Sequence, residues 1–464
     1  MKINPRSLFH RTRTPALVVG SVSLLVILGQ VGMAQVPKVI PAQNVQEEYV
    51  IYGSATISGG ETSVAVDPTD PNHVIVGVLT TKNDVFGSGE LPDGTAEQDS
   101  RRAKVAHAYC VFAQTWDGGK NWTYFEDHTG LNNYDSALRF APDGTLYKYV
   151  EAVGDFKTSV DKGKTWSAGG TTPSTTMALR AVVRIYVDNL TGTVYATGPS
   201  RATPDNPAHP SFVVSHDKGA TWTPPQSWDS MSKDYPSLGG YSASVANGSL
   251  AVAYLSGTAG GAPQRIVFGT SKDEGKTFES HVVAPYTPTL SSRVTLAADQ
   301  SKPGRYAIMT MSPDATQLWV YVTENNGNSW SKAVAAQAPK GTMLINKDSK
   351  TPAAIVYKDN LRMLSAMMYN TNGQLAILWR ARYPDDSYDV WSSLSNDGGK
   401  TFKSLRVSNT TSPAKSLKRG AFLNHEDYWD LDMDKESVHF VYTGSQPGFL
   451  ATWYARIPIS DYSK

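Results

Sequence analysis

Short runs of alternating apolar and polar residues recur along most of the chain, and turn-forming residues separate them. Paired runs occur at Thr62–Val66 with Val74–Leu79, Ala181–Val187 with Thr193–Ala196, and Tyr241–Val245 with Leu250–Leu255. The connections are rich in Asp, Asn, Pro and Gly, as in Asn247-Gly248. Alternation over so few residues, bounded by turn formers, is typical of short antiparallel β-strands. The pattern therefore predicts an all-β fold built from many hairpins.

A second pattern, a recurring turn motif, lies between these strands. Six segments share the motif Ser/Thr-x-Asp-x-Gly-x-Thr-Trp/Phe, namely Thr115–Trp122, Ser159–Trp166, Ser215–Trp222, Ser271–Phe278, Thr323–Trp330 and Ser395–Phe402. Asn121 replaces the Thr of the first copy, and Asn325 replaces the Asp of the fifth. The Asp can accept hydrogen bonds from following backbone N–H groups, and the Gly can adopt the positive φ of a tight turn. We call these segments the aspartate turns and predict a structural role, because one Asp per repeat places the carboxylates far apart.

The aspartate turns resemble the Asp-boxes, also called BNR repeats, of sialidases and related β-propeller proteins. The resemblance extends from about residue 50 to the end of the chain. It implies a single β-propeller of four-stranded antiparallel blades, in which each box joins the third strand of a blade to the fourth.

The number of blades depends on the residues that follow the sixth aspartate turn. Three further strands are predicted after Phe402, at Tyr428–Met433, Val438–Tyr442 and Ala451–Ile457. Glu48–Ile57 could supply the fourth strand of that last blade and close the ring, which removes exposed sheet edges. We therefore favour seven blades, with six as the alternative.

The N-terminus predicts a signal peptide at residues 1–34, followed by the propeller domain at residues 35–464. Its basic residues are Lys2, Arg6, Arg11 and Arg13. The apolar stretch Ala16–Leu28 is short for a membrane span, and Gly32-Met33-Ala34 offers a cleavage site after Ala34. An uncleaved N-terminal anchor is the alternative. The expected location is secreted or periplasmic, with no membrane association after cleavage.

Composition narrows the function classes. The net charge of +1 gives no basis for binding nucleic acid or an anionic membrane. Cys110 is the only cysteine, so an exported chain would hold no internal disulfide, and its apolar surroundings predict a buried thiol. His425 has no partner at zinc-like spacing, and HExxH, P-loop and GxSxG motifs are absent. We predict no metal and no cofactor, and a monomer.

Strand alternation places the aspartate turns on one face of the ring, the turn face, and the blade-to-blade loops on the other, the loop face. A ligand site is expected on the loop face, over the central axis. Polar residues stand just before the predicted inner strands at Glu61, Tyr134, Asp135, Arg180, Asp234, Tyr235, Arg293 and His425–Tyr428.

The segment Asn424–Asp430 is the densest polar and aromatic cluster in the chain. It combines acid/base groups with a stacking surface for a sugar. The predicted catalytic residues are Glu426, Asp427, Tyr428, Asp234 and Tyr235. The predicted substrate-binding residues are Glu61, Asp135, Arg180, Arg293 and Trp429.

The resemblance to sialidases implies three arginines on a substrate carboxylate, a Tyr nucleophile activated by a Glu, and an Asp acid/base. Arg180 and Arg293 fit the arginine role, with Arg362 or Arg419 as the third. The sialidase motif Phe/Tyr-Arg-Ile-Pro precedes the first box, whereas here Arg456-Ile457-Pro458 lies near the C-terminus and Glu61 occupies the first blade. The sequence therefore favours a glycoside hydrolase of the exo-sialidase-like class, acting on an extracellular glycan with a carboxylate, over a sialidase in the strict sense.

Two other functions stay open. A non-catalytic extracellular propeller that binds a glycan or a protein would need only aromatic and hydrogen-bonding groups. An assembly factor for another exported protein would need a large apolar patch on one face. A catalytic site would instead bring a carboxylate close to a second carboxylate or a Tyr, with a perturbed pKa.

Overall fold

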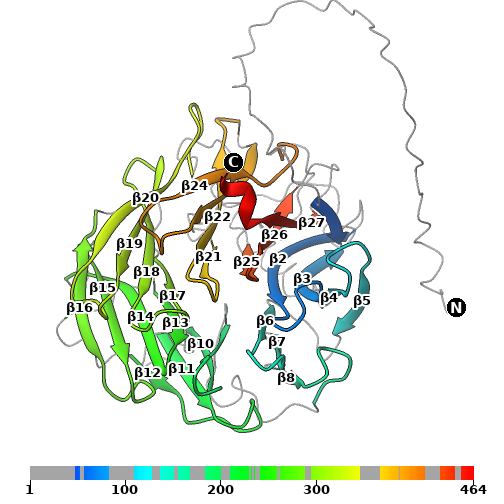
Figure 1. Ribbon diagram of the computed structural model, residues 1–464, viewed down its shortest axis with the longest axis horizontal. Helices are drawn as coiled ribbons and strands as arrows, with labels where there is room; N and C mark the ends of the chain where they lie inside the picture. Colours follow the sequence, from blue (N-terminus) through cyan, green and yellow to red (C-terminus); the bar gives the residue numbers. More distant parts are fainter. Residues whose placement is uncertain are drawn as a thin grey trace, which may run out of the picture. The chain divides into compact units, whose positions relative to one another are not determined.

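The computed structural model (Figure 1) describes residues between 48 and 463, with gaps. The described residues are 48–52, 57–82, 109–127, 136–150, 155–167, 183–199, 210–228, 231, 235, 241–258, 262–287, 294–344, 366–385, 387–412, 429–444 and 451–463. They belong to the compact unit Ile40–Lys464. The predicted signal peptide at residues 1–34 lies outside them.

The described strands form seven antiparallel sheets, one for each blade of a propeller. Blade 1 contains β2 (Ile57–Val66), β3 (Val74–Lys82), β4 (Tyr109–Thr115) and β5 (Thr123–Asp127). Blade 2 contains β6 (Ser136–Phe140), β7 (Leu146–Val150) and β8 (Asp155–Ser159). Blade 3 contains β9 (Arg184–Val187), β10 (Val194–Pro199), β11 (Pro210–Ser215) and β12 (Gln226–Ser227).

The second half of the ring repeats this order. Blade 4 contains β13 (Ser242–Ala246), β14 (Ser249–Ser256), β15 (Arg265–Ser271) and β16 (Glu279–Pro285). Blade 5 contains β17 (Thr295–Ala298), β18 (Tyr306–Met311), β19 (Gln317–Thr323) and β20 (Ser331–Gln337). Blade 6 contains β21 (Ala366–Tyr369), β22 (Leu375–Arg382), β23 (Tyr388–Ser395) and β24 (Lys403–Arg406). Blade 7 contains β25 (Asp430–Met433), β26 (Ser437–Gly444), β27 (Ala451–Pro458) and β1 (Glu48–Tyr52).

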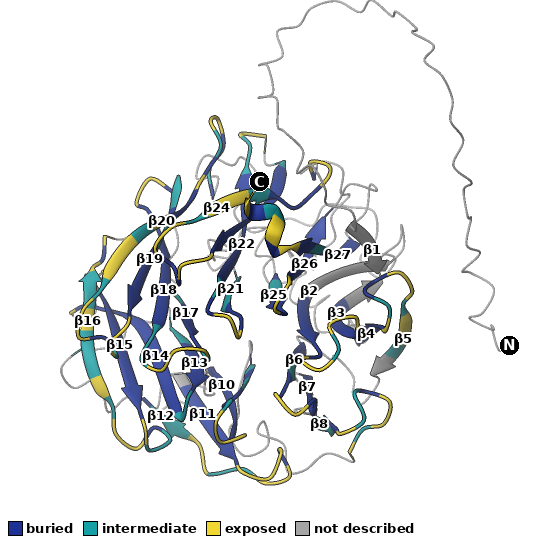
Figure 2. Ribbon diagram, in the orientation of Figure 1, coloured by how far each residue is buried: buried dark blue, intermediate teal, exposed yellow. Residues whose placement is uncertain are grey.

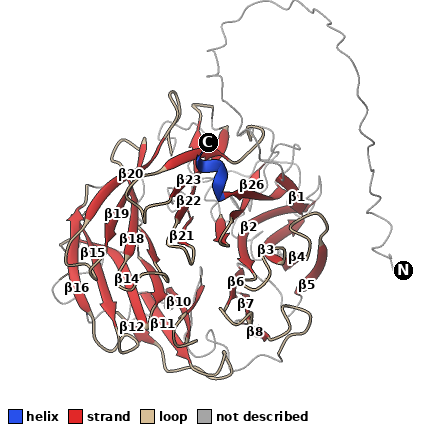
Figure 3. Ribbon diagram, viewed as in Figure 1, coloured by secondary structure: helices blue, strands red, loops and turns tan. Residues whose placement is uncertain are grey.

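The prediction of seven blades is confirmed, and so is closure by the N-terminal strand. β1 pairs antiparallel with β27, with Tyr49 opposite Tyr454 and Val50 opposite Trp453. The predicted strands at Ala181–Val187 and Tyr428–Met433 begin later, at Arg184 and Asp430, and the residues in front of them are partly outside the described chain. In blade 2 the described residues form three strands. Ile459–Ser463, after β27, forms a short 3-10 helix (Figure 3).

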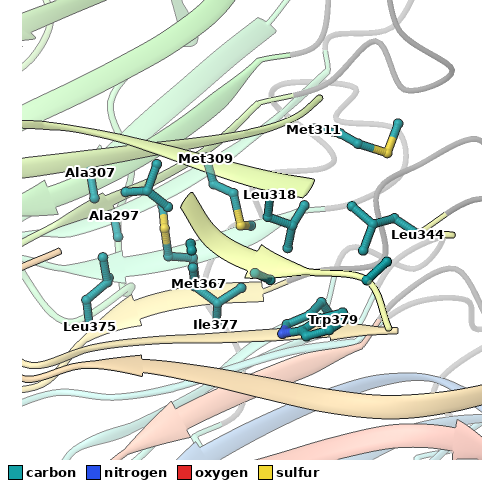
Figure 4. Close-up of a cluster of buried hydrophobic side chains, with 14 of the residues drawn as sticks. Ala297, Ala307, Met309, Met311, Leu318, Leu344, Met367, Leu375, Ile377 and Trp379 are labelled. Carbon is teal, nitrogen blue, oxygen red and sulfur yellow. The ribbon is translucent and has the colours of Figure 1, made fainter. Parts of the chain in front are cut away.

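A buried apolar cluster fills each seam between neighbouring blades. In the seam between blades 5 and 6, Met309 and Leu318 lie beside Ile377 and Trp379 (Figure 4). The inner strands are mostly buried, whereas β16 and β20 at the rim carry exposed residues (Figure 2). Cys110 is buried in the seam between blades 1 and 2, as predicted. The core is therefore a ring of inter-blade contacts.

The aspartate turns fold as the predicted hairpin turns. In the third copy, Thr221 donates to Asp217 from both its backbone N–H (2.8 Å) and its hydroxyl (2.6 Å). The Ser215 hydroxyl donates to the same carboxylate (2.8 Å), and these bonds hold the pKa of Asp217 at about 2. The two deviating copies keep equivalent bonds, because the Asn121 amide donates to Asp117 and the Asn325 side-chain oxygen accepts from Ser329.

In the second to sixth aspartate turns, the glycine also packs against the preceding blade. A Cβ on Gly219 would lie 2.2 Å from the ring of Phe156 in blade 2. A Cβ on Gly275 would lie 2.1 Å from the ring of Phe212 in blade 3. Both glycines have positive φ, at 85° and 84°. The turn glycine therefore serves backbone conformation and the fit between blades at once.

No helix among the residues that the structure describes is long and apolar enough to cross a membrane.

Candidate functional site

Three of the ten predicted site residues lie within the described chain. Glu61 lies inside β2 at a register shift between Gly60 and Thr62, because Ile57–Gly60 already pair with β3. Its predicted position in front of an inner strand was therefore wrong. The other seven lie outside the described residues, so their roles stay predictions: Asp135, Arg180, Asp234, Arg293, Glu426, Asp427 and Tyr428.

Tyr235 and Trp429 are both packed against the core. The carbonyl of Tyr235 accepts a hydrogen bond from the Tyr254 hydroxyl (2.9 Å), and its half-buried ring faces Arg265. The side chain of Trp429 is only 3% exposed, and its indole N–H donates to the Thr443 hydroxyl (3.0 Å). In this structure Trp429 fills the seam between blades 6 and 7, and no broad face of its ring is open for stacking on a sugar.

A different set of polar residues meets on the central axis. In β9, Arg184 and Tyr186 alternate with the buried Ile185 and Val187. Successive side chains of a strand point to opposite sides, so Arg184 and Tyr186 share the side opposite Ile185 and Val187, which fill the seam between blades 2 and 3. Tyr186 also packs against the apolar cluster between blades 3 and 4. In β25, Asp430 and Asp432 likewise share one side, opposite Leu431 and Met433, and of these four residues only Asp430 is not buried. We call five residues the axial cluster: Arg139 of β6, Arg184 and Tyr186 of β9, and Asp430 and Asp432 of β25.

Contacts across the ring show that the axial cluster converges. The Arg139 guanidinium of blade 2 lies 3.8 Å from the Asp432 carboxylate of blade 7 and 3.8 Å from the Met368 sulfur of blade 6. Blades 2 and 6 are not neighbours, so this side chain reaches across the centre, around which β6, β21 and β25 lie (Figure 1). The Arg139 side chain is 23% exposed, so it remains partly accessible to solvent.

The two aspartates also join blade 7 to blade 1. Asp430 accepts a hydrogen bond from the Val64 N–H (3.2 Å), and Asp432 accepts one from the Val66 N–H (2.9 Å). Between blades 4 and 5, the Ser242 and Ser244 hydroxyls accept the corresponding bonds from β17 (both 3.0 Å). Serine therefore suffices for this contact, and the negative charge at the seam between blades 7 and 1 is an addition to it.

The environment of the axial cluster perturbs its acid and its phenol. Burial raises the pKa of Asp430 from 3.8 to about 6, against the nearby positive charge of Arg184. Burial also raises the pKa of Tyr186, while Arg184 and Arg139 act in the opposite direction. A carboxyl group that titrates near pH 6 can donate or accept a proton under physiological conditions. The cluster thus combines two cations suited to a carboxylate with one group suited to proton transfer.

The sequence carried a signal for the axial cluster. In the runs Arg184-Ile185-Tyr186-Val187 and Asp430-Leu431-Asp432-Met433, charged or phenolic residues occupy alternate positions of an inner strand. The inner strands surround the central axis, and Arg139 of β6 and Asp432 of β25 approach each other there (Figure 1). Our prediction weighed the residues in front of the inner strands and overlooked those within them.

Replacing Asp430 by asparagine is expected to stabilise the protein at neutral pH. A folded-state pKa raised from 3.8 to about 6 means that this group contributes its full stability below about pH 4 and loses it as the pH rises through 6. The oxygen of the introduced amide can still accept the Val64 N–H without carrying a charge. The free energy of unfolding at pH 7 should rise by up to about 3 kcal/mol, and the difference from wild type should vanish near pH 4. Denaturant titrations at both pH values measure it, and equal effects at both would contradict the assignment.

Within the described residues, no group of three or more His, Cys, Asp or Glu side chains could hold a metal ion.

No protein-family model and no curated protein matches this sequence. Solved structures do resemble it. A protein of unknown function from Dyadobacter fermentans is 12% identical with a TM-score of 0.46, and the alignment covers 90% of this chain and 99% of that one. A Hadza microbial sialidase is 16% identical with a TM-score of 0.43, covering 76% of this chain and 74% of that one. YCF48 with a bound peptide is 12% identical with a TM-score of 0.45, covering 91% and 99%. At such low identity these likenesses concern the fold.

Proposed function

We propose that this protein is an exported glycan-active enzyme, a glycoside hydrolase whose axial cluster binds a carboxylate-bearing saccharide from the loop face. The observation that carries the proposal is the axial cluster, in which Arg139 lies 3.8 Å from Asp432 of blade 7. The charge of Arg184 acts on both Tyr186 and Asp430, and burial raises the pKa of Asp430 to about 6. We further propose that the aspartate turns are Asp-boxes of the BNR type, and that residues 1–34 are a cleaved signal peptide.

Each residue of the axial cluster has a role in this proposal. Arg184 pairs with the substrate carboxylate, since a guanidinium can donate two parallel hydrogen bonds to it. Asp430 donates a proton to the leaving oxygen of the glycosidic bond, for which a carboxyl group titrating near pH 6 is suited. Water supplies the hydroxyl group that replaces the leaving oxygen on the sugar carbon, and the Tyr186 phenol, kept protonated by burial, hydrogen-bonds the sugar.

The chain order supports a contribution from the predicted loop residues. Glu426, Asp427 and Tyr428 directly precede Trp429 and β25, whose first residue is Asp430. β25 begins at the loop face, so the prediction for these residues and the role proposed for Asp430 concern one continuous stretch of the sequence. Their predicted catalytic role is therefore compatible with that of Asp430, and we retain both.

A glycan array with terminal sialic acids and uronic acids, followed by a hydrolysis screen, tests the proposal. Arg184→Met should lower binding of acidic glycans by about 100-fold or more, as expected for the loss of a charge-assisted pair. Asp430→Asn should keep binding within a few-fold and abolish turnover.

His216→Gln provides the matched control, because His216 is exposed on the turn face and pairs only with Glu274 among the contacts of the described chain. Binding that survives in Arg184→Met would overturn the site. Acidic-glycan binding that Arg184→Met abolishes, with no turnover by the wild type, would favour the non-catalytic glycan-binding propeller.

A further inference from the structure

A buried histidine lies at the seam between blades 1 and 2, on the turn face and away from the axial cluster. His73 directly precedes β3, and its side chain is fully buried. Its Nδ1 lies 3.2 Å from a carboxylate oxygen of Asp67, and its Nε2 lies 2.6 Å from the side-chain nitrogen of Gln114 in β4. Both ring nitrogens therefore have a polar partner.

The second contact of Gln114 fixes the proton on the imidazole. The same amide nitrogen of Gln114 donates to the backbone carbonyl of Lys162 in blade 2 (2.8 Å). A carbonyl oxygen can only accept, so the amide must present its N–H groups here rather than its oxygen. With one N–H directed at Lys162, the other points at Nε2 of His73, which must accept. His73 is thus neutral, with its proton on Nδ1 and directed at Asp67.

Protonation of His73 is incompatible with this arrangement. A second N–H on the ring would face the N–H of Gln114 at 2.6 Å, placing two donors against each other. The side-chain amide of Gln114 could rotate so that its oxygen accepts from the ring. That oxygen would then also face the Lys162 carbonyl, and the hydrogen bond to this carbonyl would be lost. One of the two bonds must break, and either loss detaches Gln114 from its position across the seam.

The charges around His73 do not remove the conflict. Asp67 would favour the imidazolium, but its carboxylate is shared with the Lys162 ammonium (2.8 Å) and with Thr69 (2.7 Å). Asp70 adds a weaker attraction, and Lys162 a repulsion. The remaining neighbours are the rings of Trp116, stacked at 3.7 Å, and Phe140, edge-on at 5.4 Å. Burial accordingly lowers the pKa of His73 below 6.5.

We propose that the His73–Gln114 contact is a proton-operated clamp between blades 1 and 2, closed while His73 is neutral and opened when His73 binds a proton. At two other seams the turn glycine packs on a phenyl ring instead, Gly219 on Phe156 and Gly275 on Phe212. Acidification should therefore loosen the first seam before these two. The lowered pKa of His73 agrees with a clamp that acid opens. The contribution of His73 to folding stability is complete above pH 6.5 and declines as the pH falls below that value.

Trp116 supplies the readout. Its ring stacks on His73 within 8° of parallel and is 39% exposed. An imidazolium quenches the fluorescence of a stacked indole, whereas a neutral imidazole does so only weakly. The fluorescence difference between wild type and Trp116→Phe, titrated from pH 8 to pH 4.5, isolates this one ring among 11 tryptophans.

Hydrogen exchange reports the seam over the same titration. We expect quenching below pH 6.5 and, at the same midpoint, at least tenfold less protection of the Gly163 amide, relative to the Gly275 amide and corrected for intrinsic exchange. In Gln114→Leu the first seam should be less protected at all pH values and lose its pH dependence. In Gln114→Glu the carboxylate can accept from the imidazolium, so the quenching midpoint should move up by about one pH unit or more. His216→Gln, on the exposed histidine of blade 3, should change neither signal.

A Trp116 signal that stays constant to pH 4.5 would overturn the clamp, as would quenching without any change in protection at Gly163. Equal loss of protection at Gly163 and Gly275 would also overturn it, because the response would then be general acid unfolding. None of these outcomes depends on glycan binding, so the clamp and the proposed function stand or fall separately.

Discussion

Gly275→Ala is expected to lower the free energy of unfolding by about 3–5 kcal/mol, a large share of the stability of a typical domain. Two effects add. Gly275 has φ of 84°, where an alanine is strained by about 1 kcal/mol. In addition, the new Cβ would lie 2.1 Å from the ring of Phe212, which is fully buried and cannot move aside without displacing the core between blades 3 and 4.

Gly192→Ala is the matched control. Gly192 also has positive φ, at 72°, but nothing lies within 4 Å of the position its Cβ would take. This substitution should cost only the conformational part, about 1 kcal/mol. Urea titrations of both variants separate the two effects. The clash assignment can be tested further in a Phe212→Ala background, where Gly275→Ala should cost no more than Gly192→Ala. Equal costs of the two glycine substitutions in the wild-type background would show that the inter-blade contact is unimportant.

The aspartate turns could be predicted from the sequence because all their determinants are local. The Ser215 hydroxyl, the Asp217 carboxylate and the Thr221 donors lie within seven consecutive residues, and so do the bonds they make. Their role as inter-blade contacts could not be predicted in the same way. Phe212 meets a glycine of the next blade, and only the closed ring brings the two together.

The number of blades was predictable by a different route. The strands predicted outside the six blades that carry aspartate turns were enough to form a seventh blade. The axial cluster was not, because its contacts join residues far apart in the chain. Arg139 and Met368 are separated by 229 positions. Nothing local to either residue indicates the other, and only their place on alternating inner strands marks them as axial. The predictions for the loop residues concerned the blade-to-blade segments, most of which lie outside the described chain.

The comparison of aspartate and serine at equivalent seams bears on function. Ser242 and Ser244 join β13 to β17 with neutral hydroxyls, whereas Asp430 and Asp432 join β25 to β2 with carboxylates. Burying an acid whose pKa rises to about 6 lowers stability at neutral pH. A charge kept at such a position, opposite Arg139 and Arg184, is the kind of local destabilisation that functional sites carry.

Removal of β1 should have the largest effect on the ring. β1 is the outer strand of blade 7 and links the start of the described chain to its end, with Glu48 opposite Ala455 and Tyr52 opposite Thr452. Deleting Glu48–Tyr52 removes the outer strand of blade 7 and leaves β27 as an unpaired edge. We expect loss of the cooperative unfolding transition and aggregation through the open edge of β27.

A peptide added in trans separates ring closure from a general loss of chain. A synthetic peptide of residues 46–53 can pair with β27 as an added strand, which restores the backbone hydrogen bonds without restoring the covalent link. It should recover a cooperative transition in the truncated protein, with a midpoint that rises with peptide concentration by mass action. A peptide with proline at position 50 is the control, because proline removes a backbone donor from the pairing and is poorly tolerated within a strand. If the truncated protein melts like the full-length protein without any peptide, closure of the ring rests on the side-chain contacts of blades 7 and 1, such as those of Asp430 and Asp432 with β2, and not on β1.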